Sequence, residues 1–285
     1  MIRYRTLRNS DYPEIFRTMD DAFSDYQVKM KTDPESYRRR LDLEGVDFQH
    51  SVGAFEGEKL VGATMNAVGY WNGVATVHDA GTGVIPEYRR KGVSTGMFEY
   101  IIPHLEKSNF KRYSLEVITD NDAAFNLYQR LGFEVTRKFV IYEAKQEAEK
   151  VELDSEIEIK TIENPDWDHL QTFWEFEPSW QNSVDCIKRA KIINFGFVIL
   201  GAYIDGDLAG YAAVFVDSGK IPQIAVAPQF RRMGIGNVLL NALNSYVTKP
   251  LIVTNIDERA VGIIELLKLN GFVRTLSQYE MVRVI

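Results

Sequence analysis

Hydrophobic residues along this chain recur either at every second position, as in strands, or at helical spacing. These two patterns predict strands and helices in the same order in each half of the chain. Alternating stretches surround Glu56-Gly57 and Asp205-Gly206, dipeptides typical of tight turns, and each stretch predicts a β-hairpin. Apolar residues at helical spacing then predict a helix, and a short strand follows it. The predicted hairpins cover residues 51–62 and 197–210, the helices 95–105 and 237–246, and the strands 113–118 and 251–253.

One motif repeats between these elements. Residues 84–94 and 226–236 both read V-x-P-x-aromatic-R-R-x-G-apolar-small, and their first arginines stand 142 residues apart. A Gly-Phe pair follows at Gly132 and again at Gly271, 139 residues apart. The preserved order and spacing indicate a duplicated domain.

The repeat predicts an α/β chain of two tandem domains, each a mixed sheet with helices on both faces. A charged segment with few large apolar residues separates the copies. We expect an N-terminal domain over residues 1–143, a linker over 144–155 and a C-terminal domain over 156–285.

Composition and charge narrow the class of partner. The 285 residues are 45% hydrophobic and carry a net charge of -7, which argues against nucleic acid or an anionic membrane as a partner. Cys186 is the only cysteine, so we expect it to pack in a core, without a disulfide or a metal cluster. No run of about 18 apolar residues predicts a membrane span, and a cytoplasmic location is expected.

The repeated motif is suited to an anion. A strand runs into a glycine-containing turn that opens a helix, where free amides and the helix dipole favour a phosphate. Neither a Rossmann nor a P-loop pattern occurs at these turns. The N-terminal loop consists of Arg89, Arg90, Lys91, Gly92, Val93 and Ser94, and the C-terminal loop of Arg231, Arg232, Met233, Gly234, Ile235 and Gly236.

At these residues the chain resembles the GNAT superfamily of N-acetyltransferases, over nearly all of both halves. The family signature Q/R-x-x-G-x-G/A matches the C-terminal loop fully and the N-terminal loop with Ser94 as a small variant. The resemblance implies a mostly antiparallel mixed sheet in each half and acetyl-CoA as the acyl donor. It also implies that the loops bind the CoA pyrophosphate and that the backbone near Thr82, Val84 and Val226 pairs with the pantetheine.

The helix after the strand distinguishes the two copies. Residues 121–133 resemble the second family signature, which implies that Asn121 or Asn126 contacts the cofactor and that Tyr128 protonates the departing thiolate. An amphipathic core position is the other interpretation of Tyr128. The corresponding residue of the second copy, four before Gly271, is Leu267, which has no proton to donate.

A base for the amine is expected on the strand before the loop. His78 and Asp79 stand there and face opposite sides by alternation, which places His78 with Thr82 and Val84 and makes it the first candidate. Glu116 on the neighbouring strand is the second candidate, and the second copy has Lys220 in the place of His78.

These patterns predict an acetyl-CoA-dependent N-acetyltransferase that acts on a small-molecule or peptide amine, mainly in the N-terminal domain. Asp25, Tyr26 and residues 70–73 are candidates for amine recognition, whereas residues 173–180 have the spacing of core aromatics. The alternatives are a non-catalytic acyl-CoA sensor, catalysis in the C-terminal domain, or an aminoacyl-tRNA-dependent transferase, which the acidic charge disfavours.

Overall fold

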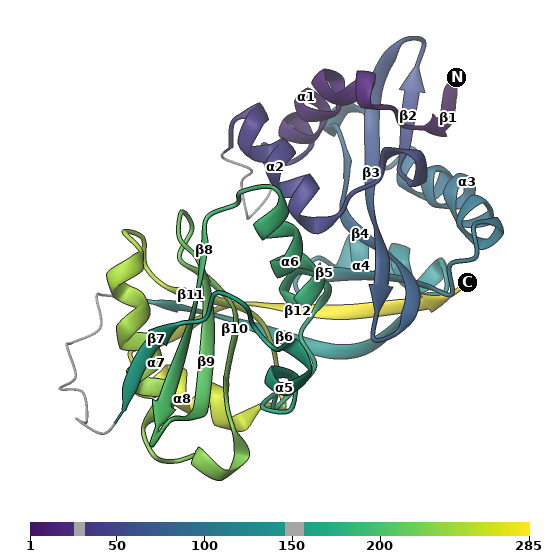
Figure 1. Ribbon diagram of the computed structural model, residues 1–285. Helices are drawn as coiled ribbons and strands as arrows, with labels where there is room; N and C mark the ends of the chain where they lie inside the picture. Colours follow the sequence, from purple (N-terminus) through teal and green to yellow (C-terminus); the bar gives the residue numbers. More distant parts are fainter. Residues whose placement is uncertain (26–31, 146–156) are drawn as a thin grey trace. The chain divides into compact units, whose positions relative to one another are not determined.

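The computed structural model describes residues 1–25, 32–145 and 157–285 (Figure 1). The chain forms two compact units. The N-terminal unit comprises Met1–Thr136 and Tyr279–Ile285, and the C-terminal unit comprises Arg137–Gln278. Tyr26 and most of the predicted linker, from residue 146 onward, lie outside the described residues.

The N-terminal unit is built on an antiparallel run from β1 to β4, to which β5 adds in parallel. Its strands are β1 (Ile2–Thr6), β2 (Val52–Glu56), β3 (Lys59–Trp71), β4 (Val74–Val84) and β5 (Arg112–Ile118). Its helices are α1 (Tyr12–Ala22), α2 (Pro34–Glu44), α3 (Val93–Lys107) and α4 (Asp122–Arg130), with short 3₁₀ turns at Asn9–Asp11, Phe48–His50 and Pro86–Tyr88.

The C-terminal unit repeats this arrangement, with β7 to β10 antiparallel and β11 parallel to β10. Its strands are β7 (Glu158–Thr161), β8 (Phe197–Ile204), β9 (Asp207–Phe215), β10 (Lys220–Val226) and β11 (Ile252–Asp257). Its helices are α5 (Trp167–Gln171), α6 (Val184–Ile192), α7 (Ile235–Leu243) and α8 (Val261–Leu269), with 3₁₀ turns at Trp180–Asn182, Pro228–Phe230 and Asn244–Tyr246.

The last strand of each copy completes the unit of the other copy. From Arg137 onward, β6 (Glu134–Ala144) belongs to the C-terminal unit, where it pairs antiparallel with β11. The end of β12 (Phe272–Val284) belongs to the N-terminal unit, where Met281 is fully buried in the core. The boundaries expected at residues 143 and 156 divide the sequence repeat, whereas the compact units divide within these two strands, because each strand supplies apolar side chains that the other copy's core buries.

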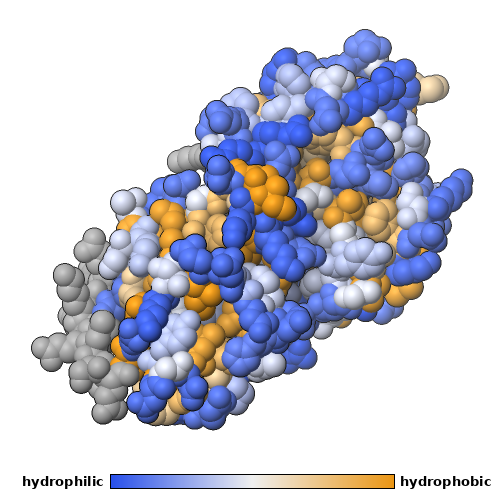
Figure 2. All heavy atoms as spheres, viewed as in Figure 1, coloured by the Kyte–Doolittle hydropathy of each residue, from blue (hydrophilic) through white to orange (hydrophobic). Residues whose placement is uncertain are grey.

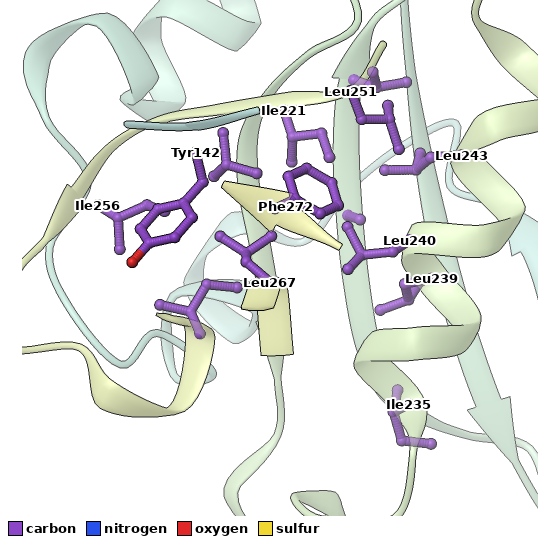
Figure 3. Close-up of a cluster of buried hydrophobic side chains, with 14 of the residues drawn as sticks. Tyr142, Ile221, Ile235, Leu239, Leu240, Leu243, Leu251, Ile256, Leu267 and Phe272 are labelled. Carbon is purple, nitrogen blue, oxygen red and sulfur yellow. The ribbon is translucent and has the colours of Figure 1, made fainter. Parts of the chain in front are cut away.

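Apolar side chains cover both faces of each sheet. In the N-terminal unit, α3 and α4 pack over one cluster that includes Val77 and Tyr113, and α1 and α2 pack over another that includes Met65. The C-terminal unit buries a large cluster beneath α7 and α8 (Figure 3). Figure 2 shows mainly hydrophilic side chains, with smaller hydrophobic patches between them, on the face that it presents.

Local sequence signals match the observed turns. Gly57 (φ 60°) lies in the turn between β2 and β3, and Asp205 (φ 51°) and Gly206 (φ 89°) form the turn between β8 and β9, so both predicted hairpins are confirmed. Cys186 is fully buried in α6. Within the three described stretches, no helix combines the length and the apolar character that crossing a membrane requires.

Candidate functional site

In each unit, two parallel strands separate beside the repeated loop. The last pair between β4 and β5 is Asp79 with Leu115, and β4 continues to Val84. In the C-terminal unit the last pair between β10 and β11 is Ile221 with Val253, and β10 continues to Val226. The backbone groups beyond each separation point are placed to pair with an extended ligand.

The two loops have the same backbone conformation. Gly92 (φ 75°) and Gly234 (φ 80°) are left-handed N-caps of α3 and α7, and two residues earlier Arg90 (φ 61°) and Arg232 (φ 67°) are left-handed as well. Among the described residues, no side chain caps either helix start. A Cβ on Gly92 or Gly234 would meet no atom of the described residues within 4 Å, which leaves room among them for an anion at both helix starts.

The first arginine of each motif fixes its loop. The Arg89 guanidinium donates to the carbonyls of Val84 (3.1 Å) and Ala22 (2.9 Å). Arg231 donates in the same way to Val226 (3.1 Å) and Phe173 (3.0 Å). Arg89 therefore ties the end of β4 to the last residue of α1, and Arg231 ties the end of β10 to the segment just after α5.

The other predicted loop residues divide into open and packed positions. The Lys91 ammonium lies 5.0 Å from the centre of the Tyr88 ring. The corresponding residue of the C-terminal loop is Met233, whose side chain is 54% exposed. The side chains of Val93 and Ile235 are buried beneath their helices. Ser94 stands in the first turn of α3, Arg232 pairs with Glu265 at 3.2 Å, and Gly236 packs against Leu266.

Asp79 and Tyr128 meet where β4 and β5 separate. The Asp79 carboxylate accepts hydrogen bonds from the Thr82 hydroxyl (2.7 Å) and the Gly81 amide (2.9 Å), and the Tyr128 hydroxyl lies 3.5 Å from it. Burial raises the pKa of Asp79 to about 6, although these hydrogen bonds oppose the shift. A carboxyl group that titrates near neutral pH beside a phenol suits proton transfer.

The prediction that His78 shares a face of the sheet with Thr82 is wrong, because β4 contains a β-bulge between these two residues. The partner of Asn66 is Asp79, but the partner of Met65 is Gly81, so Ala80 is an extra residue. An extra residue exchanges the two faces beyond it, and Thr82 therefore lies with Asp79. Sequence alternation missed Asp79 for this reason.

His78 occupies a different environment. It is 2% exposed, and its Nδ1 lies 3.0 Å from the Ser114 hydroxyl on β5. Burial lowers the pKa of His78 to about 3, which keeps the ring neutral and makes it a weak proton acceptor. Glu116 alternates with the buried Leu115 and so lies on the face of β5 that carries Ser114.

Aromatic packing holds Tyr128 in place. Its ring meets Phe98 edge-on at 5.6 Å and Phe133 at 5.8 Å between centroids. Asn121 is the N-cap of α4 and accepts a hydrogen bond from the Ala124 amide (3.1 Å), whereas Asn126 is exposed. The cap of Asn121 orients the helix that carries Tyr128.

The C-terminal unit has apolar residues at the corresponding positions. Ile221 stands seven residues before Pro228, as Asp79 stands before Pro86, and Leu267 corresponds to Tyr128. Ile221 and Leu267 are fully buried in the same hydrophobic cluster (Figure 3). Neither side chain can exchange a proton.

The C-terminal unit contains a cavity of about 600 Å³ next to its loop. The walls come from the loop at 231–237, from β10 and α8, and from an aromatic segment after α5. The Glu175 carboxylate in that segment accepts hydrogen bonds from the amides of Gly262 (2.9 Å) and Ile263 (3.2 Å) at the start of α8.

The described candidates for amine recognition differ in their position and exposure. Asp25 is exposed and forms a two-point ion pair with Arg89, with both distances 2.7 Å, and this hydrogen bonding lowers the pKa of its carboxyl group. Its charge is therefore already compensated. Tyr70 is 71% exposed near the tip of the β3–β4 hairpin, whereas Trp71 is buried.

Comparisons with known proteins all point to acetyltransferases. A model described as "Acetyltransferase (GNAT) family" matches residues 12–133 and 158–272. The ribosomal protein bS18-alanine N-acetyltransferase of Escherichia coli is 42% identical over 50 residues, which are 18% of this chain and 34% of that protein. The probable N-acetyltransferase san of Drosophila melanogaster is 41% identical over 54 residues, 19% of this chain and 29% of that protein. The chain thus matches only about a third of the length of these relatives.

Solved structures resemble the whole chain. A tandem GNAT protein from the clavulanic acid biosynthesis pathway has a TM-score of 0.72 at 14% identity and covers 100% of this chain and 98% of its own. A putative acetyltransferase from Pyrococcus horikoshii has a TM-score of 0.69 at 18% identity and covers 100% and 89%. At these identities the likeness concerns the fold.

Proposed function

We propose that this chain, which belongs to the acetyltransferase (GNAT) family, transfers an acetyl group from acetyl-CoA to a primary amine in its N-terminal unit. The observation that carries the proposal is the Asp79–Tyr128 pair at the point where β4 and β5 separate. The C-terminal unit has the same loop and strand separation but Ile221 and Leu267 at the paired positions, which favours binding without transfer.

The residues of the N-terminal loop suit a CoA pyrophosphate. The open helix start at Gly92, with Arg90 and Lys91 beside it, would hold the phosphates, and the edge of β4 from Thr82 to Val84 would pair with the pantetheine. The ligand supplies an acyl thioester, which is already activated toward an amine. The protein's tasks are therefore alignment and proton transfer.

Asp79 would act as the base. With a pKa of about 6 it is ionised at neutral pH and can accept the proton that the amine nitrogen loses as it bonds to the carbonyl carbon. Tyr128 would donate its proton to the departing sulfur. Asp79 can then return a proton to Tyr128 across the 3.5 Å between their oxygens, so that the amine proton ends on the thiol and both side chains are restored.

A panel of primary amines, screened for CoA release with products identified by mass spectrometry, tests this proposal. We expect acetylated product from the wild-type chain and a loss of about 10²-fold or more in Asp79→Asn. His78→Gln is the comparison variant, because His78 lies on the same strand with its ring against Ser114. Equal activity of wild type and Asp79→Asn, or a larger loss in His78→Gln, would remove Asp79 from the mechanism.

A further inference from the structure

An aromatic strap, which we define as residues 173–178, forms one wall of the cavity in the C-terminal unit. The strap is held at three successive residues. The carbonyl of Phe173 accepts from Arg231 (3.0 Å), the indole of Trp174 donates to the Tyr211 hydroxyl (2.6 Å), and Glu175 binds the α8 amides. These contacts fix the strap to Arg231 of the loop, to β9 and to the start of α8.

Most of the residues that line the space against the strap are apolar, with Gln223 and Thr254 among the polar ones. Phe176 and Pro178 line it from the strap, and Ile224 and Ile263 line it from β10 and α8. Glu175 is the charged residue of the strap that lines the cavity, and its carboxylate is already bound by two amides at the positive end of α8. An uncharged, apolar group is therefore the occupant that this wall favours.

The N-terminal unit differs at the same place. Arg89 holds the carbonyl of Ala22 as Arg231 holds that of Phe173, and three residues after these carbonyls stand Asp25 and Phe176 respectively. Asp25 directs an exposed carboxylate at Arg89, whereas Phe176 turns an aromatic ring to the cavity. At this one described position, a charged side chain of the N-terminal unit corresponds to an aromatic ring in the C-terminal unit.

We propose that the cavity of the C-terminal unit binds a medium-chain fatty acyl-CoA, with the acyl chain against the aromatic strap, and that this acyl group is not transferred. The inference rests on the CoA binding proposed above for the C-terminal loop and adds the class of acyl group. Three observations support it: a cavity of about 600 Å³ that joins the glycine-containing loop to an apolar wall, the edge of β10 beyond its last pair with β11 between them, and Ile221 and Leu267 where proton-transfer groups would stand. The volume lies within the roughly 300–1,000 Å³ of ordinary ligand pockets.

Calorimetry on the full chain carrying Gly92→Asp, which should weaken binding at the N-terminal loop by placing a carboxylate where the phosphate would lie, tests the acyl preference. The ligands are CoA, acetyl-CoA and octanoyl-CoA. Each buried methylene strengthens binding by about fourfold, so even partial burial of the octanoyl chain makes octanoyl-CoA at least about tenfold tighter than acetyl-CoA. Phe176→Ala should reduce this ratio severalfold. Phe195→Ala is the matched control, since that ring is also half-buried in the C-terminal unit but packs on Phe215 outside the cavity lining, and it should leave the ratio unchanged.

The outcomes separate this inference from the proposed function. Equal affinities for acetyl-CoA and octanoyl-CoA overturn the acyl preference and leave CoA binding intact. Absence of any CoA binding in Gly92→Asp overturns both claims about the C-terminal unit, while acetyl transfer by the wild-type chain still tests the N-terminal unit. An octanoylated amine detected by mass spectrometry overturns the statement that the acyl group is not transferred. If Gly92→Asp fails to fold, Gly234→Asp in the otherwise wild-type chain should abolish the octanoyl preference, and its persistence overturns the proposal.

Discussion

The two units share a backbone and differ in two side chains at its centre. Both have left-handed residues at the same loop positions, an arginine that holds the loop, and parallel strands that separate after a short pairing. At the separation point the N-terminal unit has Asp79 and Tyr128, and the C-terminal unit has Ile221 and Leu267. In the proposed function the backbone provides for ligand binding and these side chains for proton transfer, so one fold can retain the first without the second.

The most severe test copies the C-terminal pair into the N-terminal unit. We expect Asp79→Ile combined with Tyr128→Leu to lower the turnover of acetyl transfer by about 10⁴-fold, because both proton-transfer groups are lost while a buried apolar pair replaces them. The affinity for acetyl-CoA should change little, since the loop is untouched. Steady-state CoA release and calorimetry measure the two quantities, and substantial turnover in this variant would contradict the division of labour.

Tyr128→Phe tests the acid alone. The ring still packs on Phe98 and Phe133, so acetyl-CoA affinity should remain, whereas turnover should fall by about 10²-fold when the proton donor is removed. Tyr113→Phe is the matched control, because this phenol lies in the same cluster but donates to Asn66 (2.7 Å). Equal turnover losses in the two variants would assign Tyr128 a structural role.

The loops can be compared by one substitution at equivalent glycines. Gly92→Asp should lower kcat/KM for acetyl-CoA by about tenfold more than Gly92→Asn, because both side chains occupy the same left-handed position but only aspartate repels a phosphate. Gly234→Asp should leave most of the acetyl transfer. If instead the Gly234 variant is inactive and the Gly92 variant active, the C-terminal unit is the enzyme.

Sequence patterns were sufficient where local chemistry decides the structure. The turn dipeptides, the V-x-P motif and the glycine that begins each helix predicted the hairpins and the loops, because left-handed backbone and tight turns require particular residues. The sequence could not show which of His78 and Asp79 shares a face with Thr82, because this depends on a bulge at Ala80. The bulge depends in turn on how β4 pairs with β3. The sequence did not indicate the exchange of β6 and β12 either, because the core that each strand joins depends on packing between segments far apart in the chain.

Burial of the Asp79 carboxyl group should lower the stability of the N-terminal unit, an effect that the C-terminal unit avoids with Ile221 at the corresponding position. The pKa of Asp79 is 3.8 when unfolded and about 6 when folded, so the folded state binds its proton more tightly. The stability associated with this group is complete below pH 4 and is lost as the pH rises to about 6, which corresponds to at most roughly 3 kcal/mol. Asp79→Asn, which cannot ionise, should therefore be more stable than the wild type at pH 7 and similar to it near pH 4.

Urea unfolding of the full chain at the two pH values measures this difference. Asp25→Asn is the control, since it makes the same substitution at an exposed carboxylate whose pKa Arg89 lowers, and it should bring no stabilisation at pH 7. A wild-type chain as stable as Asp79→Asn at pH 7 would mean that Asp79 is not destabilised by burial. The pKa needed for a base near neutrality would then be absent, and the contrast between Asp79 and Ile221 would no longer explain which unit carries out the chemistry.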